Sequence, residues 1–71
     1  MEHKIEEQIA KISTKTNGWS LELNKVSWNG NPAKLDIRNW NEDHSKCSKG
    51  ITLTEEEAGS IHKAFTELLE K

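Results

Sequence analysis

The stretch Lys34-Leu35-Asp36-Ile37-Arg38-Asn39-Trp40 decides the fold, because polar and apolar residues alternate along most of it. Successive side chains of a β-strand point to opposite faces of the sheet. Leu35 and Ile37 therefore share an aliphatic side. The opposite side is charged and aromatic, with Lys34, Asp36, Arg38 and Trp40. The stretch predicts a strand over about residues 33–40, with one side for the core and one side left open.

The preceding segment, residues 19–28, is expected to be a second strand with an irregularity. Apolar residues of one parity come first and are Trp19, Leu21 and Leu23. Val26 and Trp28 then fall on the other parity. A change of parity within one strand indicates a bulge or bend, which we place near residues 24–25. The turn into the next strand is Asn-Gly-Asn-Pro at residues 29–32.

The first segment, residues 5–15, allows two interpretations. Three isoleucines recur at the spacing of a helix, at positions 5, 9 and 12. The run Ile12-Ser13-Thr14 nevertheless favours a strand, because β-branched residues are enriched in sheets. Asn17-Gly18 follows, which is a typical hairpin turn. We expect a strand that forms a hairpin with the next segment.

The C-terminal part predicts a polar loop over residues 41–48, a short fourth strand over residues 49–53 and a helix over about residues 55–70. Thr54 and Glu57 have the spacing of a capping box. Apolar residues then recur at helical spacing at Ala58, Ile61, Phe65, Leu68 and Leu69. We expect this stripe to pack on the aliphatic side of the sheet and to leave the other side uncovered. The fold class is therefore α+β, with a four-stranded antiparallel sheet and one C-terminal helix.

The composition is that of one small domain, residues 1–71. A chain of 71 residues, of which 32% are hydrophobic, buries only a small core. We therefore expect it to gain stability from a partner, and a second copy is the simplest partner.

Secreted and membrane-spanning proteins are not indicated. Residues 1–8 are charged and lack the apolar region of a secretory signal peptide. No apolar run approaches the ~18 residues of a membrane span. Cys47 is the only cysteine, so an intrachain disulfide is excluded. We expect a cytoplasmic, nucleoid-associated protein that has no membrane partner.

Catalytic and cofactor sites are not indicated either. His44 and Cys47 are metal-ligand types three residues apart, but a structural zinc site needs four ligands and no second pair is present. The sequence has neither a P-loop nor a dinucleotide-binding glycine motif. We expect a binding protein that is not an enzyme and that carries no metal and no cofactor.

The charge is unevenly distributed, although its sum is −2. Residues 9–53 carry seven Lys or Arg against four Asp or Glu, a net charge of +3. Residues 1–8 and 54–71 carry −2 and −3. A basic surface in the middle of the chain is therefore compatible with an acidic protein.

Aromatic rings and cations coincide on the open side of the predicted sheet. In single-stranded nucleic-acid binding, rings stack on bases and cations follow the phosphates. The expected contact residues are Lys25, Trp28, Asn29, Lys34, Arg38, Trp40, Lys46 and Lys49. Single-stranded DNA is the expected ligand, and RNA is an alternative because sheet-borne aromatics also bind RNA. A protein-interaction adaptor is a second alternative, because Trp and Arg are common interface anchors.

Three runs of the sequence resemble the C-terminal domain of transcriptional positive cofactor four, in particular its short bacterial members. They are Leu23-Asn24-Lys25-Val26-Ser27-Trp28-Asn29-Gly30, Lys34-Leu35-Asp36-Ile37-Arg38-Asn39-Trp40 and Lys49-Gly50-Ile51-Thr52-Leu53-Thr54. The resemblance covers about residues 5–69. It implies a curved four-stranded antiparallel sheet, one helix and a homodimer formed through that helix and adjoining strand edges. The implied dimer contacts on the helix are Ile61, Phe65, Leu68 and Leu69.

The resemblance also implies a function for the expected site. Members of this family bind single-stranded or unwound DNA with little sequence preference. Transcription or replication machinery is the implied class of protein partner, and the implied processes are transcription, replication and repair. By position, Trp28 corresponds to a family aromatic that contacts bases, Arg38 to the arginine of Asp-Ile-Arg, and Lys49 to the lysine before the glycine. Asn41 stands where the family has a further tryptophan, and Trp40 supplies a ring one position earlier.

Overall fold

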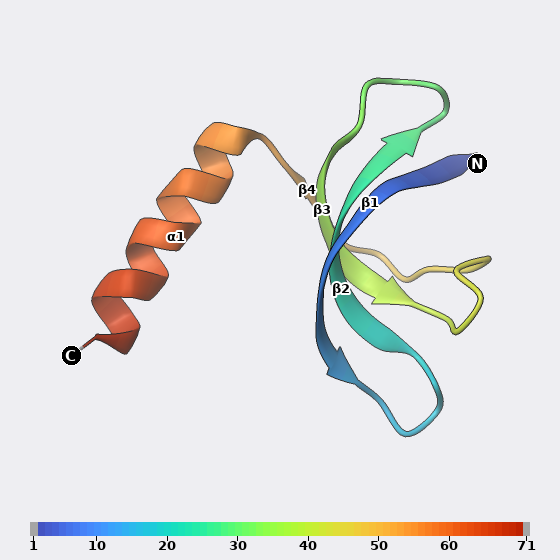
Figure 1. Cartoon of the computed structure of the whole chain (residues 1–71), viewed down its shortest axis with the longest axis horizontal. Coiled ribbons are helices and arrows are strands. Elements are labelled where there is room, and N and C mark those ends of the chain that lie inside the picture. Colours follow the sequence, from blue (N-terminus) through green and yellow to red (C-terminus); the bar gives the residue numbers. More distant parts are fainter. Residues whose placement is uncertain (1, 71) are drawn as a thin grey trace.

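The computed structural model describes residues 2–70 and shows an open, curved antiparallel sheet followed by one helix (Figure 1). The strand order in the sheet follows the chain, and the elements are β1 (His3–Thr14), β2 (Ser20–Trp28), β3 (Lys34–Trp40), β4 (Ile51–Leu53) and α1 (Glu55–Leu69). The strands bend at both ends away from α1, so α1 lies on the convex side and the β3–β4 loop on the concave side (Figure 1). The expected α+β class and strand arrangement are confirmed.

β1 pairs with β2 through three register shifts, each of which inserts one extra residue into β1. Positions that share the face of Val26, Asn24 and Glu22 therefore recur every three residues along β1 instead of every two. Ile9 and Ile12 are themselves the extra residues at two of these shifts, so isoleucines three residues apart occur here in a strand and not in a helix. The expectation of a strand in this segment is confirmed.

The bulge expected in the second strand near residues 24–25 is wrong. β2 pairs with β3 without interruption from Ser20 opposite Trp40 to Val26 opposite Lys34. The extra residues at this level of the sheet belong to β1. The change of parity along β2 has another cause, which is that both faces of this central strand are partly apolar.

The continuous register of β2 and β3 defines two faces, because directly opposite residues of an antiparallel pair point to the same side. The aliphatic face carries Leu21, Leu23, Leu35, Ile37 and Leu53. The polar face carries Ser20, Glu22, Asn24, Val26, Trp28, Lys34, Asp36, Arg38 and Trp40. The alternation that decided the fold is therefore present in the structure.

Burial within the chain is greatest on the polar face, contrary to the expectation that this side is uncovered. Val26, Asp36 and Trp40 are fully buried. Most of the aliphatic face is only half-buried. The loop of residues 41–48 covers the polar face, and it is anchored where His44 contacts Glu22. The interior of the single chain is thus largely polar and aromatic.

α1 begins with the expected capping box, in which Thr54 Oγ1 accepts the Glu57 N–H at 3.0 Å and a Glu57 side-chain oxygen accepts the Thr54 N–H at 2.9 Å. The expected packing of its apolar stripe on its own sheet is wrong. α1 contacts the sheet mainly at β4, and Phe65, Leu68 and Leu69 are 56%, 60% and 76% exposed. Within residues 2–70, no helix has the length and apolar content that crossing a bilayer requires.

An apolar groove separates α1 from the aliphatic face. Its volume is about 260 Å³. All four strands and α1 contribute to its lining, which consists of Ile12, Leu23, Leu35, Ile37, Leu53, Ala58, Ile61, His62 and Phe65. The stripe of α1 therefore points toward the aliphatic face without covering it.

Gly50 lies where the chain enters β4, and it permits close contact with β3. A Cβ atom at this position would collide with Arg38 Cβ and with the carbonyl oxygen of Ile37. We expect Gly50→Ala to lower the free energy of unfolding by about 1–3 kcal/mol, because the collision involves backbone that cannot move away. Urea denaturation measures the loss.

The matched control is Gly59→Ala in α1, where a Cβ meets nothing within 4 Å. This variant is expected to gain up to about 1 kcal/mol from helix propensity. Equal stability of the Gly50 variant and the wild type would show that β4 does not lie this close to β3.

Candidate nucleic-acid interface

Trp28 and Trp40 end neighbouring strands on the polar face, and their rings lie together. The ring centroids are 6.1 Å apart and the planes differ by 14°. Trp28 is half-buried, whereas Trp40 is fully buried. The Trp40 ring is enclosed by Trp28, by His3 at 4.9 Å and by His44 at 5.8 Å between centroids.

The burial of Trp40 is contrary to its expected place on an open face, and its contact with a base remains a prediction. A ring without exposed surface offers no face on which a base can stack. The β3–β4 loop and the N-terminal end of β1 cover it, and neither contact was visible in the alternation of β3. Trp40 supports Trp28 from within the fold instead.

Arg38 contacts the Trp28 ring of this aromatic pair. Its guanidinium carbon is 4.4 Å from the centroid of the Trp28 ring, a cation–π contact. Asp36 holds the guanidinium by two bonds, Nε to Oδ1 and Nη2 to Oδ2, each 2.7 Å long. Burial acts to lower the pKa of Arg38, but the hydrogen bonds and charge of Asp36 outweigh it, so this pKa lies above its ordinary value. Arg38 is thus permanently charged and firmly positioned.

The expected lysines do not all join this surface. Lys34, Lys46 and Lys49 are exposed on β3 and on the β3–β4 loop. Lys25 stands opposite Leu35, so it lies on the aliphatic face and not beside Trp28 and Arg38, and its contact with nucleic acid remains a prediction. The sequence alone could not fix the face of Lys25, because the alternation of apolar residues along β2 changes near this residue.

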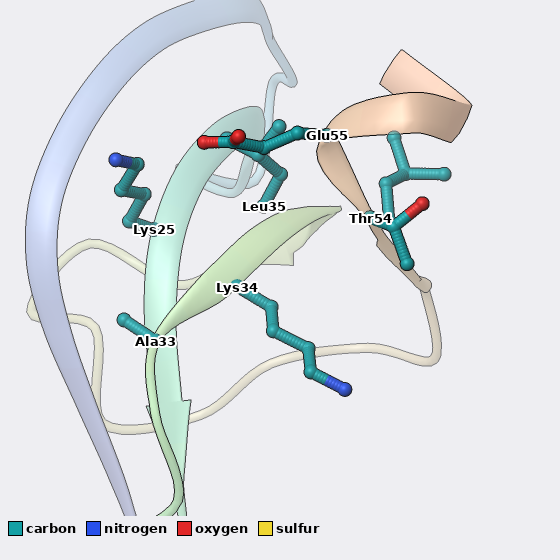
Figure 2. A pocket seen from close by; sticks show the side chains of 7 residues that line it. Lys25, Ala33, Lys34, Leu35, Thr54 and Glu55 are labelled. Atoms are coloured by element: carbon teal, nitrogen blue, oxygen red, sulfur yellow. The ribbon is translucent and has the colours of Figure 1, made fainter.

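Lys25 and Lys34 both border a hollow of about 280 Å³ next to the start of α1. Figure 2 shows their amines pointing away from one another on different sides of β3. The remaining lining residues are Ala33, Leu35, Leu53, Thr54 and Glu55. The two amines do not converge on one point, and the carboxylate of Glu55 lies at the same hollow. The hollow therefore does not favour an anion.

Asn29 occupies the β2–β3 turn with a positive φ of 53°. Its Oδ1 accepts the Glu2 N–H at 3.1 Å, and its own N–H donates to the Glu2 carbonyl at 2.9 Å. The residue therefore fastens the N-terminal end of β1 to the turn beside Trp28. The prediction that Asn29 contacts nucleic acid remains a prediction, as it does for Lys34, Lys46 and Lys49.

A buried polar cluster around Glu22 holds the loop over the polar face, and it was not predicted from the sequence. Glu22 Oε2 accepts Ser20 Oγ at 2.6 Å, and Oε1 accepts Asn24 Nδ2 at 3.1 Å. His44 Nε2 lies 2.9 and 3.0 Å from the two carboxylate oxygens. His3 Nε2 lies 2.9 Å from the His44 carbonyl oxygen. The sequence does hold a sign of this cluster. Residues 20, 22 and 24 are polar and alternate with leucines, which places them together on one face of β2.

The carboxylate of Glu22 makes this cluster sensitive to acid. Burial acts to raise the pKa of Glu22, but hydrogen bonds from Ser20, Asn24 and His44 outweigh it and bring the pKa below 4.5. A lowered pKa in the folded state means that ionised Glu22 stabilises the fold fully above about pH 4.5. This contribution is lost as the pH falls through the folded-state pKa.

We therefore expect wild type to exceed Glu22→Gln in stability at pH 7 and to lose that advantage toward pH 3. Urea midpoints of both proteins across this range measure the difference. A constant difference at every pH would show that the ionisation of Glu22 does not stabilise the fold.

Taken together, the geometry presents one half-buried indole with a guanidinium on it, beside exposed lysines. Such a surface can stack bases and attract phosphates.

The amino-acid sequence is similar to that of other proteins. A protein of Treponema pallidum (strain Nichols), named only as an uncharacterized protein, is 61% identical over 46 residues, which are 65% of this chain and 54% of that relative. The chain thus spans about half the length of this relative. Residues 15–64 match the family described as transcriptional coactivator p15 (PC4). This match covers most of the chain, including β2, β3, β4 and the start of α1, so the protein belongs to the transcriptional coactivator p15 (PC4) family.

Proposed function

We propose that the chain is one subunit of a homodimer that binds single-stranded DNA with little sequence preference. It performs no catalysis and supports transcription, replication or repair, in contact with the machinery of these processes. The observation that carries the proposal is the Trp28 ring at the edge of the polar face, with the Arg38 guanidinium on it. Lys34, Lys46 and Lys49 supply exposed positive charge on the same strand and the following loop.

Binding of single-stranded DNA by this surface requires no base-specific contact. Every base has a flat face, so stacking on an aromatic ring tolerates all sequences and is worth ~1–3 kcal/mol per base. Lysines that contact phosphates release bound counterions, and this makes affinity fall as salt rises. The acidic residues of α1 lie on another element, so the net charge of −2 does not oppose binding at this surface.

The test is a titration of the full chain with oligo-dT, followed by tryptophan fluorescence at several salt concentrations. Quenching that saturates and that weakens with salt is expected, because Trp28 stacks on bases. Absence of binding at low salt by a folded protein would refute the proposal. Tighter binding of matched oligo-rU would favour an RNA-binding module. A co-purifying protein that resists nuclease and high salt would favour an adaptor.

The homodimer is supported by the apolar surface that the single chain leaves exposed. Phe65, Leu68 and Leu69 line one side of α1, and the groove beside α1 is almost entirely apolar. A stripe of this kind needs an apolar partner, and the expected contacts Ile61, Phe65, Leu68 and Leu69 would meet their counterparts in a second copy.

We expect Phe65→Glu to convert the dimer to monomers, because a charge would be buried in the interface. Light scattering during size-exclusion chromatography gives the mass. The control is Ser60→Glu, which adds the same charge at an exposed position of α1. A Phe65 variant with the wild-type mass, or a wild-type protein of 8.1 kDa at high concentration, would exclude a dimer through this stripe.

A further inference from the structure

The guanidinium of Arg38 is committed to partners inside the chain. Both of its bonds to Asp36 are 2.7 Å long, and the Asp36 side chain has no exposed surface. Thr52 Oγ1 adds a hydrogen bond to Asp36 Oδ2 at 3.3 Å. Asp36 thereby balances the charge of Arg38 in a fork-to-fork pair, the geometry in which arginine is most strongly held.

The same guanidinium also contacts an aromatic ring. It lies on Trp28 at 4.4 Å, and only 14% of the Arg38 side chain is exposed. On the β4 side, the absence of a Cβ at Gly50 lets the backbone approach Arg38 Cβ closely. The guanidinium is therefore held by Asp36 and contacts the indole, so it cannot turn toward a passing strand without breaking both contacts.

Other cations are better placed to contact phosphates. Lys34, Lys46 and Lys49 are exposed, and among residues 2–70 none of them forms an ion pair. An exposed ammonium on a flexible stem adapts to a mobile phosphate chain, whereas a partly buried, paired guanidinium does not.

We propose that Arg38 and Asp36 are positioning residues of the DNA site, which hold the Trp28 ring ready to stack on a base, and that Arg38 neutralises no phosphate. This inference rests on the proposed binding of single-stranded DNA. In this arrangement Trp28, held by Arg38 and Asp36, contacts the bases, and the exposed lysines contact the phosphates.

The salt dependence of oligo-dT binding tests this division, because each phosphate contact contributes about 0.7 to the slope of log K against log salt. The double variant Asp36→Asn with Arg38→Gln replaces the ion pair by a neutral hydrogen-bonded pair and keeps the net charge. It is expected to bind roughly 3- to 10-fold more weakly with the wild-type slope. Lys49→Ala, the matched reference, is expected to lower the slope by about 0.7. A double variant whose slope falls as far as that of Lys49→Ala would overturn the proposal.

Arg38→Lys keeps Asp36 paired with a cation, so it remains informative if the double variant does not fold. An ammonium has no flat face to lay on Trp28. Weaker binding with an unchanged slope is expected, together with a changed tryptophan emission in the free protein. Wild-type affinity in this variant would show that charge alone matters and would overturn the proposal. Failure of the wild type to bind oligo-dT would instead refute the proposed function itself.

Discussion

Trp40→Ala is expected to remove a large fraction of the free energy of unfolding. The ring is fully buried among Trp28, His3 and His44, so its removal leaves a large cavity at the centre of the polar face. Truncation of a buried tryptophan costs about 3–5 kcal/mol. Small domains have about 5–15 kcal/mol of stability in all. Urea denaturation followed by circular dichroism measures the loss.

Trp40→Phe is the control for this effect. It retains most of the ring, and the indole N–H that it removes has no hydrogen-bond partner among the residues described. We therefore expect a smaller loss of stability than in the alanine variant. If Trp40→Ala instead keeps the wild-type stability and loses DNA binding, then Trp40 is an exposed contact residue in solution.

Trp28→Ala is expected to have the opposite profile, with a large loss of affinity for oligo-dT and a smaller loss of stability. Stacking worth ~1–3 kcal/mol per base corresponds to roughly 5- to 150-fold in affinity. Trp28 is only half-buried, so a smaller cavity forms. Affinity is best measured by anisotropy of a labelled oligonucleotide, because the variant lacks the intrinsic reporter.

Trp28→Phe tests whether the loss comes from the ring. A phenyl ring stacks on bases and also receives the Arg38 guanidinium, so affinity close to the wild type is expected. Equal weakening in the alanine and phenylalanine variants would point to a specific role of the indole. Unchanged affinity in Trp28→Ala would remove this residue from the site.

The elements that depend on local chemistry could be predicted from the sequence. The alternation of Lys34 to Arg38 placed β3 and its two faces, and Thr54 with Glu57 marked the start of α1. Both signals act within a few residues, so no distant contact could overrule them. The family resemblance is confirmed as well, because it rests on short runs within residues 23–54, all of which lie in the matched region.

The covered and uncovered faces could not be assigned in this way. Alternation separates two sides of a strand but does not say which one other segments will cover. Here the polar face is covered by residues 41–48, through the contact of His44 with Glu22 over 22 positions in the chain. The alternation therefore placed Arg38 and Trp40 on one face correctly, yet it gave both the same exposure. Only the tertiary contacts distinguish the half-buried Arg38 from the fully buried Trp40.

The three inserted residues of β1 make one edge of the sheet irregular. β1 is 12 residues long and lies at the outer edge of the sheet, with Ile9 and Ile12 exposed. A regular edge of this length presents evenly spaced donors and acceptors, on which strands of other molecules can add without limit. Each inserted residue breaks that even spacing and increases the local twist. The irregularity that gives β1 the appearance of a helix in the sequence thus protects the sheet from growing into aggregates.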